Sequence, residues 1–321
     1  MDQFNVYKDM KARTNGEIYI GVVGPVRTGK STFIKRFMNL MVLPNIEDEN
    51  DRNRANDELP QSSSGKTIMT TEPKFVPNEA VSIKTEEGIE LNVRLIDCVG
   101  YMVEGATGHM EGEEERLVKT PWFDYEIPFT KAAAIGTKKV ITEHSTIGVV
   151  VTCDGSFGEI AAKQYEPAEE ETIKQLKALK KPFVVLLNTI HPYSESTKQL
   201  AAEKEEKYQT KVLPMNLEQM KKEDIYEIIK SVLMEFPISS IGFYVPRWTE
   251  MLKKDHPLKM ELLQMARDVI TEKTTMRDIY EEQEKEYEYI TGQKLESVAM
   301  DSGEVVITVK VGDVYYYEFF K

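Results

Sequence analysis

The sequence is poor in cysteine, in histidine and in long apolar runs. Its 321 residues include only two cysteines and four histidines, and the histidines lack metal-ligand spacing. A disulfide-stapled fold is therefore excluded, and a zinc site is not expected. Cys98 and Cys153 each lie beside or within an apolar stretch, and we expect both to be buried, reduced thiols, as in a cytosolic protein. Since no run of about 20 apolar residues and no apolar signal region occurs, we expect any membrane attachment to be peripheral.

Basic residues are also in deficit. The chain carries 41 Lys and Arg against 54 Asp and Glu, a formal net charge of −13. A surface of that sign repels phosphate backbones, so broad nucleic-acid binding is disfavoured. With 41% hydrophobic residues the chain can bury a full core, and its length favours two domains.

One short motif organises the first two thirds of the chain. Residues 24–31 read GPVRTGKS and fit the P-loop pattern G-x-x-x-x-G-K-[ST]. A strand-like segment, 17–23, precedes the motif, and helical spacing follows it over 31–40, which is the context that a P-loop requires. Lys30 would lie between the β- and γ-phosphates, and the Ser31 hydroxyl would bind Mg²⁺. The predicted nucleotide contacts here are Gly24, Val26, Arg27, Thr28, Gly29, Lys30, Ser31 and Thr32.

A second segment is predicted to complete the magnesium site. The apolar run 93–96 ends in Asp97, and Gly100 follows three residues later. This spacing fits a Walker B aspartate, which holds Mg²⁺, and a glycine whose N–H meets the γ-phosphate. The next residue is Tyr101, where Ras-type GTPases carry a glutamine that orients the attacking water. Either the ring shields the site and water is positioned otherwise, or hydrolysis is slow.

Threonines before the second strand are candidates for closing over the nucleotide. Residues 44–74 are polar and turn-rich, which is long for a connection in a compact domain. In switch proteins a threonine from this region contacts the γ-phosphate and Mg²⁺. Thr67, Thr70 and Thr71 are available, and Thr70 and Thr71 are favoured because they abut the strand at 75. The alternative is that they only cap or extend that strand.

The base-recognition segment departs from the GTPase pattern. Asn188-Thr189-Ile190-His191 stands where a GTPase carries Asn-Lys-x-Asp, so the aspartate that pairs with guanine is missing. We therefore predict ATP as the nucleotide, with Asn188 and His191 as candidate base contacts. The alternative for His191 is an exposed loop histidine.

Alternating strand and helix patterns predict an α/β fold with a mainly parallel sheet and helices on both faces. We expect a hairpin over 75–97, an irregular insert over 102–128 with a solvated acidic cluster (Glu111, Glu113, Glu114, Glu115), and a first domain over 1–237. The expected helices are 129–144, 166–180, 197–208 and 224–235, and the expected strands between them are 146–152, 182–188 and 211–215. A smaller α+β domain, 238–321, should follow, with a helix over 257–288 and strands over 305–311 and 314–320. Because the last strand ends the chain, we expect that domain to be incomplete or to offer an edge to a partner.

Together the stretches GVVGPVRTGKSTFIKRFM, RLIDCVGY and HSTIGVVVTCDGSFG closely resemble the stage IV sporulation protein A family of spore-coat morphogenetic ATPases. That resemblance implies a translation-factor-class GTPase fold that uses ATP and Mg²⁺. It identifies Lys30 as the Walker A lysine, Asp97 as the Walker B aspartate, and Thr70 and Thr71 as sensor threonines. It also implies that hydrolysis drives self-assembly into a polymer, the basement layer of the coat. The layer lies on the mother-cell side of the outer forespore membrane, with a small amphipathic membrane-binding protein and coat proteins as partners. Family members are longer than this chain.

Arg27 is a further catalytic candidate. It stands where potassium-activated GTPases bind a cation with asparagine, so its guanidinium would act like an arginine finger in cis; a plain surface arginine is the alternative. Two other functions stay open: a nucleotide-gated scaffold with incidental turnover, and a ribosome-associated GTPase.

Overall fold

The structure is a computed structural model of the chain, and it describes residues 6–60, 72–84, 89–111, 114–157, 160–281 and 285–319. Its contacts divide the chain into two compact units. The first unit covers Val6–Val232, and the second begins at Leu233.

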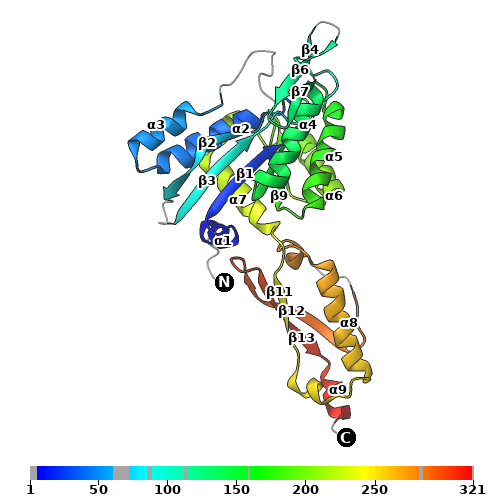
Figure 1. Cartoon of the computed structure of the whole chain (residues 1–321). Coiled ribbons are helices and arrows are strands. Elements are labelled where there is room, and N and C mark those ends of the chain that lie inside the picture. The colour runs from blue at the N-terminus through cyan, green and yellow to red at the C-terminus, as the bar shows by residue number, and fades with distance from the viewer. Residues whose placement is uncertain are drawn as a thin grey trace. The chain divides into compact units, whose positions relative to one another are not determined.

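The first unit is built on a six-stranded sheet with the order β10-β9-β8-β1-β3-β2 (Figure 1). All neighbouring strands in it pair in parallel except β2, which runs antiparallel to β3 at the edge. The strands are β1 (Glu17–Val23), β2 (Lys74–Lys84), β3 (Glu90–Asp97), β8 (Ile147–Cys153), β9 (Phe183–Asn188) and β10 (Val212–Met215). The prediction of a mixed α/β unit with a mainly parallel sheet is therefore confirmed, as is the β2–β3 hairpin.

The central strands read as continuous apolar runs because both of their faces are covered. Every residue of β8 and of β9 is buried. A strand buried on both faces needs apolar residues at every position rather than at alternate ones, which is typical of a parallel sheet between helices.

Helices lie on both faces of this sheet (Figure 1). On one face, side chains of α5 and α6 and of the turn after α4 form a core cluster with β8, β9 and β10; Leu176 and Val150 in it are fully buried. Helix α2 contacts β1 and β3, and its Phe33 and Ile34 are fully buried. The helices are α1 (Val6–Arg13), α2 (Lys30–Phe37), α3 (Glu49–Asp57), α4 (Phe129–Lys139), α5 (Ala162–Ala178), α6 (Glu195–Tyr208) and α7 (Lys222–Met234).

The insert between β3 and α4 is more regular than predicted. It forms two small hairpins, β4 (Met110–Glu111) with β5 (Glu114–Glu115), and β6 (Leu117–Thr120) with β7 (Phe123–Pro128). Glu115 accepts hydrogen bonds from the N–H and the hydroxyl of Thr130, so this acidic residue caps the start of α4 instead of only facing solvent. The expectation of an irregular segment was wrong because short, charged strands lack a clear alternation of apolar and polar residues.

The second unit has a three-stranded sheet, β11-β13-β12, with α8 beside it (Figure 1). Its elements are β11 (Ser240–Tyr244), α8 (Pro257–Glu272), β12 (Ile290–Ala299), β13 (Glu304–Val311) and α9 (Asp313–Phe319). The strand predicted over 305–311 is confirmed. The helix predicted over 257–288 ends at Glu272, and the sequence reasoning missed β11 and β12.

The prediction of a final strand over 314–320 was wrong. The described part of this aromatic segment belongs to α9 (Asp313–Phe319). The ring of Tyr315 packs edge-on against Tyr289, and that of Tyr316 packs against Trp248. Aromatic packing against neighbours thus overrides the strand propensity of the three consecutive tyrosines, and these tyrosines lie on a helix instead of the exposed edge strand inferred from them.

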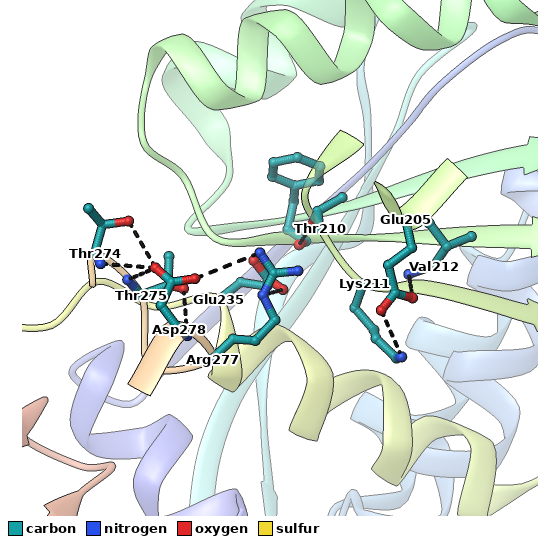
Figure 2. Close-up of polar contacts among 10 residues, drawn as sticks. Glu205, Thr210, Lys211, Val212, Glu235, Thr274, Thr275, Arg277 and Asp278 are labelled. Atoms are coloured by element: carbon teal, nitrogen blue, oxygen red, sulfur yellow. Dashed lines mark hydrogen bonds and ion pairs between the residues drawn. The ribbon is translucent and has the colours of Figure 1, made fainter. Parts of the chain in front are cut away.

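A carboxylate secures the turn after α8 in the second unit. Asp278 accepts hydrogen bonds from the N–H groups of Thr274 and Thr275, at 2.9 and 2.8 Å, and next to it Arg277 lies 3.5 Å from Glu235 (Figure 2). Although burial raises the pKa of Asp278, these hydrogen bonds outweigh it and lower that pKa. Figure 2 also shows Glu205 of the first unit accepting hydrogen bonds from Lys211 and from the N–H of Val212 at the start of β10.

Candidate functional site

The 24–31 loop connects β1 to α2 at the carboxyl end of the parallel sheet, as the sequence predicted. Its backbone is left-handed at Gly24 (φ 126°), Arg27 (φ 59°) and Gly29 (φ 100°). A Cβ on Gly24 would lie 2.4 Å from the carbonyl oxygen of Val151, so only glycine fits there. The loop leads directly into the first turn of α2, whose N–H groups have no partner inside the helix and face an anion favourably.

Lys30, Ser31 and Asp97 meet at this end of the sheet. The Lys30 side chain is buried, and its Nζ donates to the carbonyl oxygens of Gly24 (3.4 Å) and Pro25 (2.5 Å). Ser31 Oγ donates to Asp97 Oδ2 at 2.8 Å. The second oxygen of this carboxylate, Oδ1, is buried and has no hydrogen-bond partner among the described residues. The cluster therefore brings together a buried cation, a hydroxyl and a carboxylate with a spare acceptor.

Burial dominates the electrostatics of these groups. It lowers the pKa of Lys30, while the nearby Cys98 and Asp97 act in the opposite direction. It raises the pKa of Asp97, against the effects of the Ser31 hydrogen bond and of Lys30. It also raises the pKa of Cys98 to about 11, so that this thiol stays protonated. A buried lysine side chain, whose charged form burial disfavours, would be stabilised in that form by an anionic ligand.

Gly100 lets the segment after β3 approach the loop closely. Its φ is 93°, and a Cβ there would lie 2.1 Å from Gly24 O and 2.7 Å from Lys30 Nζ. Next to it, the carbonyl of Tyr101 accepts the N–H of Val26 at 2.9 Å. The amide of Val26, which the sequence placed among the nucleotide contacts, is thus engaged within the protein.

The Tyr101 side chain turns toward α5. It packs against an apolar cluster that contains Val26 and Tyr165, and burial raises its pKa to about 12, with Gln175 and Glu171 of α5 beside it. At the position of the Ras-type glutamine, the structure therefore places a packed, neutral phenol.

Asn188 joins three segments of the site. Its Nδ2 donates to Thr28 O at 3.0 Å, and its Oδ1 accepts the N–H of Leu217 at 3.2 Å, so β9, the 24–31 loop and the segment after β10 are tied together. The side chain is 7% exposed, and Thr189 after it is fully buried. His191 is exposed, and its backbone N–H donates to Thr189 Oγ1. Asn188 therefore holds the 24–31 loop in place through its buried amide. Of the two predicted base contacts, Asn188 and His191, only His191 is exposed to solvent.

Some predicted residues have other roles or lie outside the described part. Thr28 is buried, and its hydroxyl donates to Pro25 O at 3.0 Å. Thr32 lies half-exposed in the first turn of α2. Thr67, Thr70 and Thr71 fall outside the described residues, as does Glu113.

Sequence reasoning missed Thr107 in the insert and Leu217 after β10. Thr107 accepts hydrogen bonds from the Arg27 guanidinium, and the Leu217 N–H meets Asn188. Each lies far along the chain from its partner, and neither belongs to a motif, so the sequence contains no signal for them. Neither cysteine forms a disulfide and both are buried, as predicted, and the described residues contain no group of His, Cys, Asp and Glu side chains arranged to hold a metal.

Comparison with protein-family models defines the class of the first unit. Residues 1–237 match the model described as the stage IV sporulation protein A ATPase domain, so this mixed α/β unit is an ATPase domain. Residues 238–321 match the middle domain of the same family. The chain therefore belongs to the stage IV sporulation protein A family.

Relatives of the same name agree with this assignment. The chain is 46% identical to stage IV sporulation protein A of Bacillus anthracis and 45% identical to that of Bacillus subtilis (strain 168), in each case over 100% of this chain and 66% of the relative. It is 49% identical to that of Clostridioides difficile (strain 630), over 98% of this chain and 64% of the relative. The chain thus spans slightly less than two thirds of the length of these relatives. In the part of the chain that the structure describes, no helix has the length and apolar character needed to cross a membrane.

Proposed function

We propose that the chain is a P-loop ATPase that binds Mg·ATP at the Gly24–Ser31 loop, and that hydrolysis drives its self-assembly into the basement layer of a spore coat. The observation that carries the proposal is the cluster of Lys30, Ser31 and Asp97, with a buried ammonium group and a carboxylate oxygen that has no partner among the described residues. The match to a sporulation ATPase domain supports the same activity.

Magnesium fits the residues of this cluster. A serine hydroxyl and an aspartate carboxylate are hard oxygen donors of the kind that Mg²⁺ prefers, and Asp97 Oδ1 accepts no hydrogen bond from any described residue. Ser31 and Asp97 would hold the ion, with Thr70 or Thr71 as the further proposed ligand. When bound, the ion neutralises charge on the β- and γ-phosphates.

The residues of the loop would act by position and charge. Lys30 would exchange its carbonyl partners for phosphate oxygens, and the amides at the start of α2 and of Gly100 would bind the same groups. Arg27 would add positive charge where charge develops on transfer. ATP is proposed over GTP because Thr189 and His191 replace the guanine-reading pair of a GTPase, and His191 is the proposed base contact.

The partners follow from family membership and remain part of the proposal. The chain would assemble with copies of itself on the cytoplasmic, mother-cell side of the outer forespore membrane. A small amphipathic membrane-binding protein would hold it there peripherally, beneath the spore-coat proteins.

A nucleotide-gated scaffold with incidental turnover is a second candidate. The packing of the Tyr101 phenol against α5 favours it, because no glutamine at that position orients a water molecule.

Phosphate release measured together with sedimentation distinguishes the two functions. The proposal predicts that ATP supports both phosphate release and the formation of sedimenting assemblies. A non-hydrolysable analogue is expected to support neither. Assembly with the analogue at the level seen with ATP would establish the scaffold instead. A Lys30→Ala variant is expected to lose ATP binding in calorimetry. In a competition assay, GTP is expected to displace bound ATP only weakly.

A further inference from the structure

Arg27 is held by the insert that follows β3. Its Nη2 donates to Thr107 Oγ1 at 2.9 Å and to Thr107 O at 3.3 Å. Both acceptors belong to one residue, 80 positions away in the sequence, so at the exposed surface they anchor one end of the guanidinium to the insert. A free arginine side chain samples many rotamers, and ordering it in each catalytic cycle would cost conformational entropy.

The segment that carries Thr107 packs against the 24–31 loop. Residues 101–109, which we call the strap, begin with the bridge between Tyr101 and Pro25 and with the hydrogen bond from the Val26 N–H to Tyr101 O. Val103 and Ala106 of the strap are buried in one cluster with Val26. The strap therefore packs on the two loop residues that come directly before Arg27, and Thr107, although exposed, follows the buried Ala106 directly.

The Arg27 guanidinium also lies near α5. Its charge opposes the effect of burial on the pKa of Tyr165, which burial raises to about 12. Arg27 itself adopts a left-handed backbone conformation, φ 59°, which is uncommon for a residue with a side chain and occurs where surrounding contacts impose it. The strap therefore contacts the Arg27 guanidinium and α5 lies near it, and Arg27 itself belongs to the loop that is predicted to bind phosphate.

We propose that Thr107 is a positioning residue: it holds the Arg27 guanidinium against the triphosphate without touching ATP itself. The inference rests on the proposed ATPase function. A guanidinium has five N–H donors in a rigid fork, so anchoring Nη2 orients the group as a whole. Placement of a charge where it is needed, before the reaction begins, is the main way in which a P-loop enzyme lowers its barrier.

The test compares Thr107→Val, which removes the hydroxyl at equal size, with Thr107→Ser, which keeps it. Steady-state phosphate release should show kcat lowered about tenfold in Thr107→Val, with KM for ATP within about twofold of the parent, and Thr107→Ser close to the parent in both. Glu104→Gln, an exposed change in the same strap, controls for general disturbance and should leave kcat unchanged. Equal melting temperatures would confirm that all variants fold.

An Arg27→Ala background tells whether Thr107 acts through Arg27. If it does, Thr107→Val added to Arg27→Ala has no further effect. Parental kcat in Thr107→Val, an equal loss in Thr107→Ser, or a full additional loss on the Arg27→Ala background would overturn the inference. Parental kcat in Arg27→Ala would overturn it as well while leaving the ATPase function intact, whereas an unmutated chain that binds no ATP in calorimetry would remove that function itself.

Discussion

Gly100→Ala tests whether the segment after β3 must approach the 24–31 loop as closely as the structure has it. Two separate costs apply at this position. The φ of 93° is unfavourable for alanine, a cost of about 1–3 kcal/mol. In addition, the new Cβ would lie 2.1 Å from Gly24 O, a backbone atom that cannot rotate away, and 2.7 Å from Lys30 Nζ.

Gly105→Ala is the matched control. Gly105 has nearly the same φ, 85°, and a Cβ there would meet only the end of the Gln164 side chain, at 3.7 and 3.9 Å. The control therefore carries the backbone cost without the clash. Because overpacking a tight site adds typically about 1–3 kcal/mol, we expect Gly100→Ala to be less stable than Gly105→Ala by about 2 kcal/mol. For a domain of this size that difference lowers the melting temperature by roughly 4–8 °C.

Thermal unfolding of the two variants measures the difference, and calorimetry with Mg·ATP measures the functional consequence. Gly100→Ala should lose most of its ATP affinity because Lys30 Nζ is displaced, while Gly105→Ala should keep it. Equal melting temperatures for the two variants, or parental ATP affinity in Gly100→Ala, would show that the loop and the segment after β3 are not in the close contact described.

Three further predictions concern single side chains. Asn188→Ala removes the bonds to Thr28 and Leu217 and should destabilise the first unit by about 2 kcal/mol; a parental denaturant midpoint would refute the bridging role. Asp97→Asn should leave the fold intact but raise the Mg²⁺ concentration needed for half-maximal phosphate release, and an unchanged magnesium titration would contradict the assignment. Because the folded pKa of Asp278 is lowered, its contribution to stability is present above its unfolded pKa, about 3.9, and is lost as pH falls through the folded value. In Asp278→Ala the free energy of unfolding should accordingly fall less steeply than in the parent as the pH drops below about 4. Identical acid-unfolding curves for the variant and the parent would argue against this role.

The sequence predicted the location of candidate site residues correctly where a local motif also stands at the carboxyl end of a buried strand. The 24–31 loop and Asp97 follow apolar strands buried on both faces, so composition, spacing and position all point to the same site. Tyr101 was visible as a departure from the GTPase pattern, but the direction of its ring was not. That direction depends on apolar neighbours such as Tyr165, which lies on a helix more than sixty residues later.

The parts that could not be predicted depend on contacts between distant residues. The segment 314–320 has strong strand propensity, yet its residues up to Phe319 belong to α9, in which Tyr316 packs against Trp248 and Tyr315 against Tyr289. The pair Arg27 and Thr107 likewise has no local pattern. Sequence periodicity reports which residues are buried, but it does not report which distant side chain they meet.

The burial of both cysteines has a practical consequence. The thiolate is the form that reacts with alkylating dyes, and burial raises the pKa of both Cys98 and Cys153. The parent chain should therefore take up little maleimide label while it is folded. A cysteine introduced on the surface, for example at the exposed Glu104, would then be labelled selectively, so fluorescence could follow individual chains as they enter an assembly without removal of the native thiols.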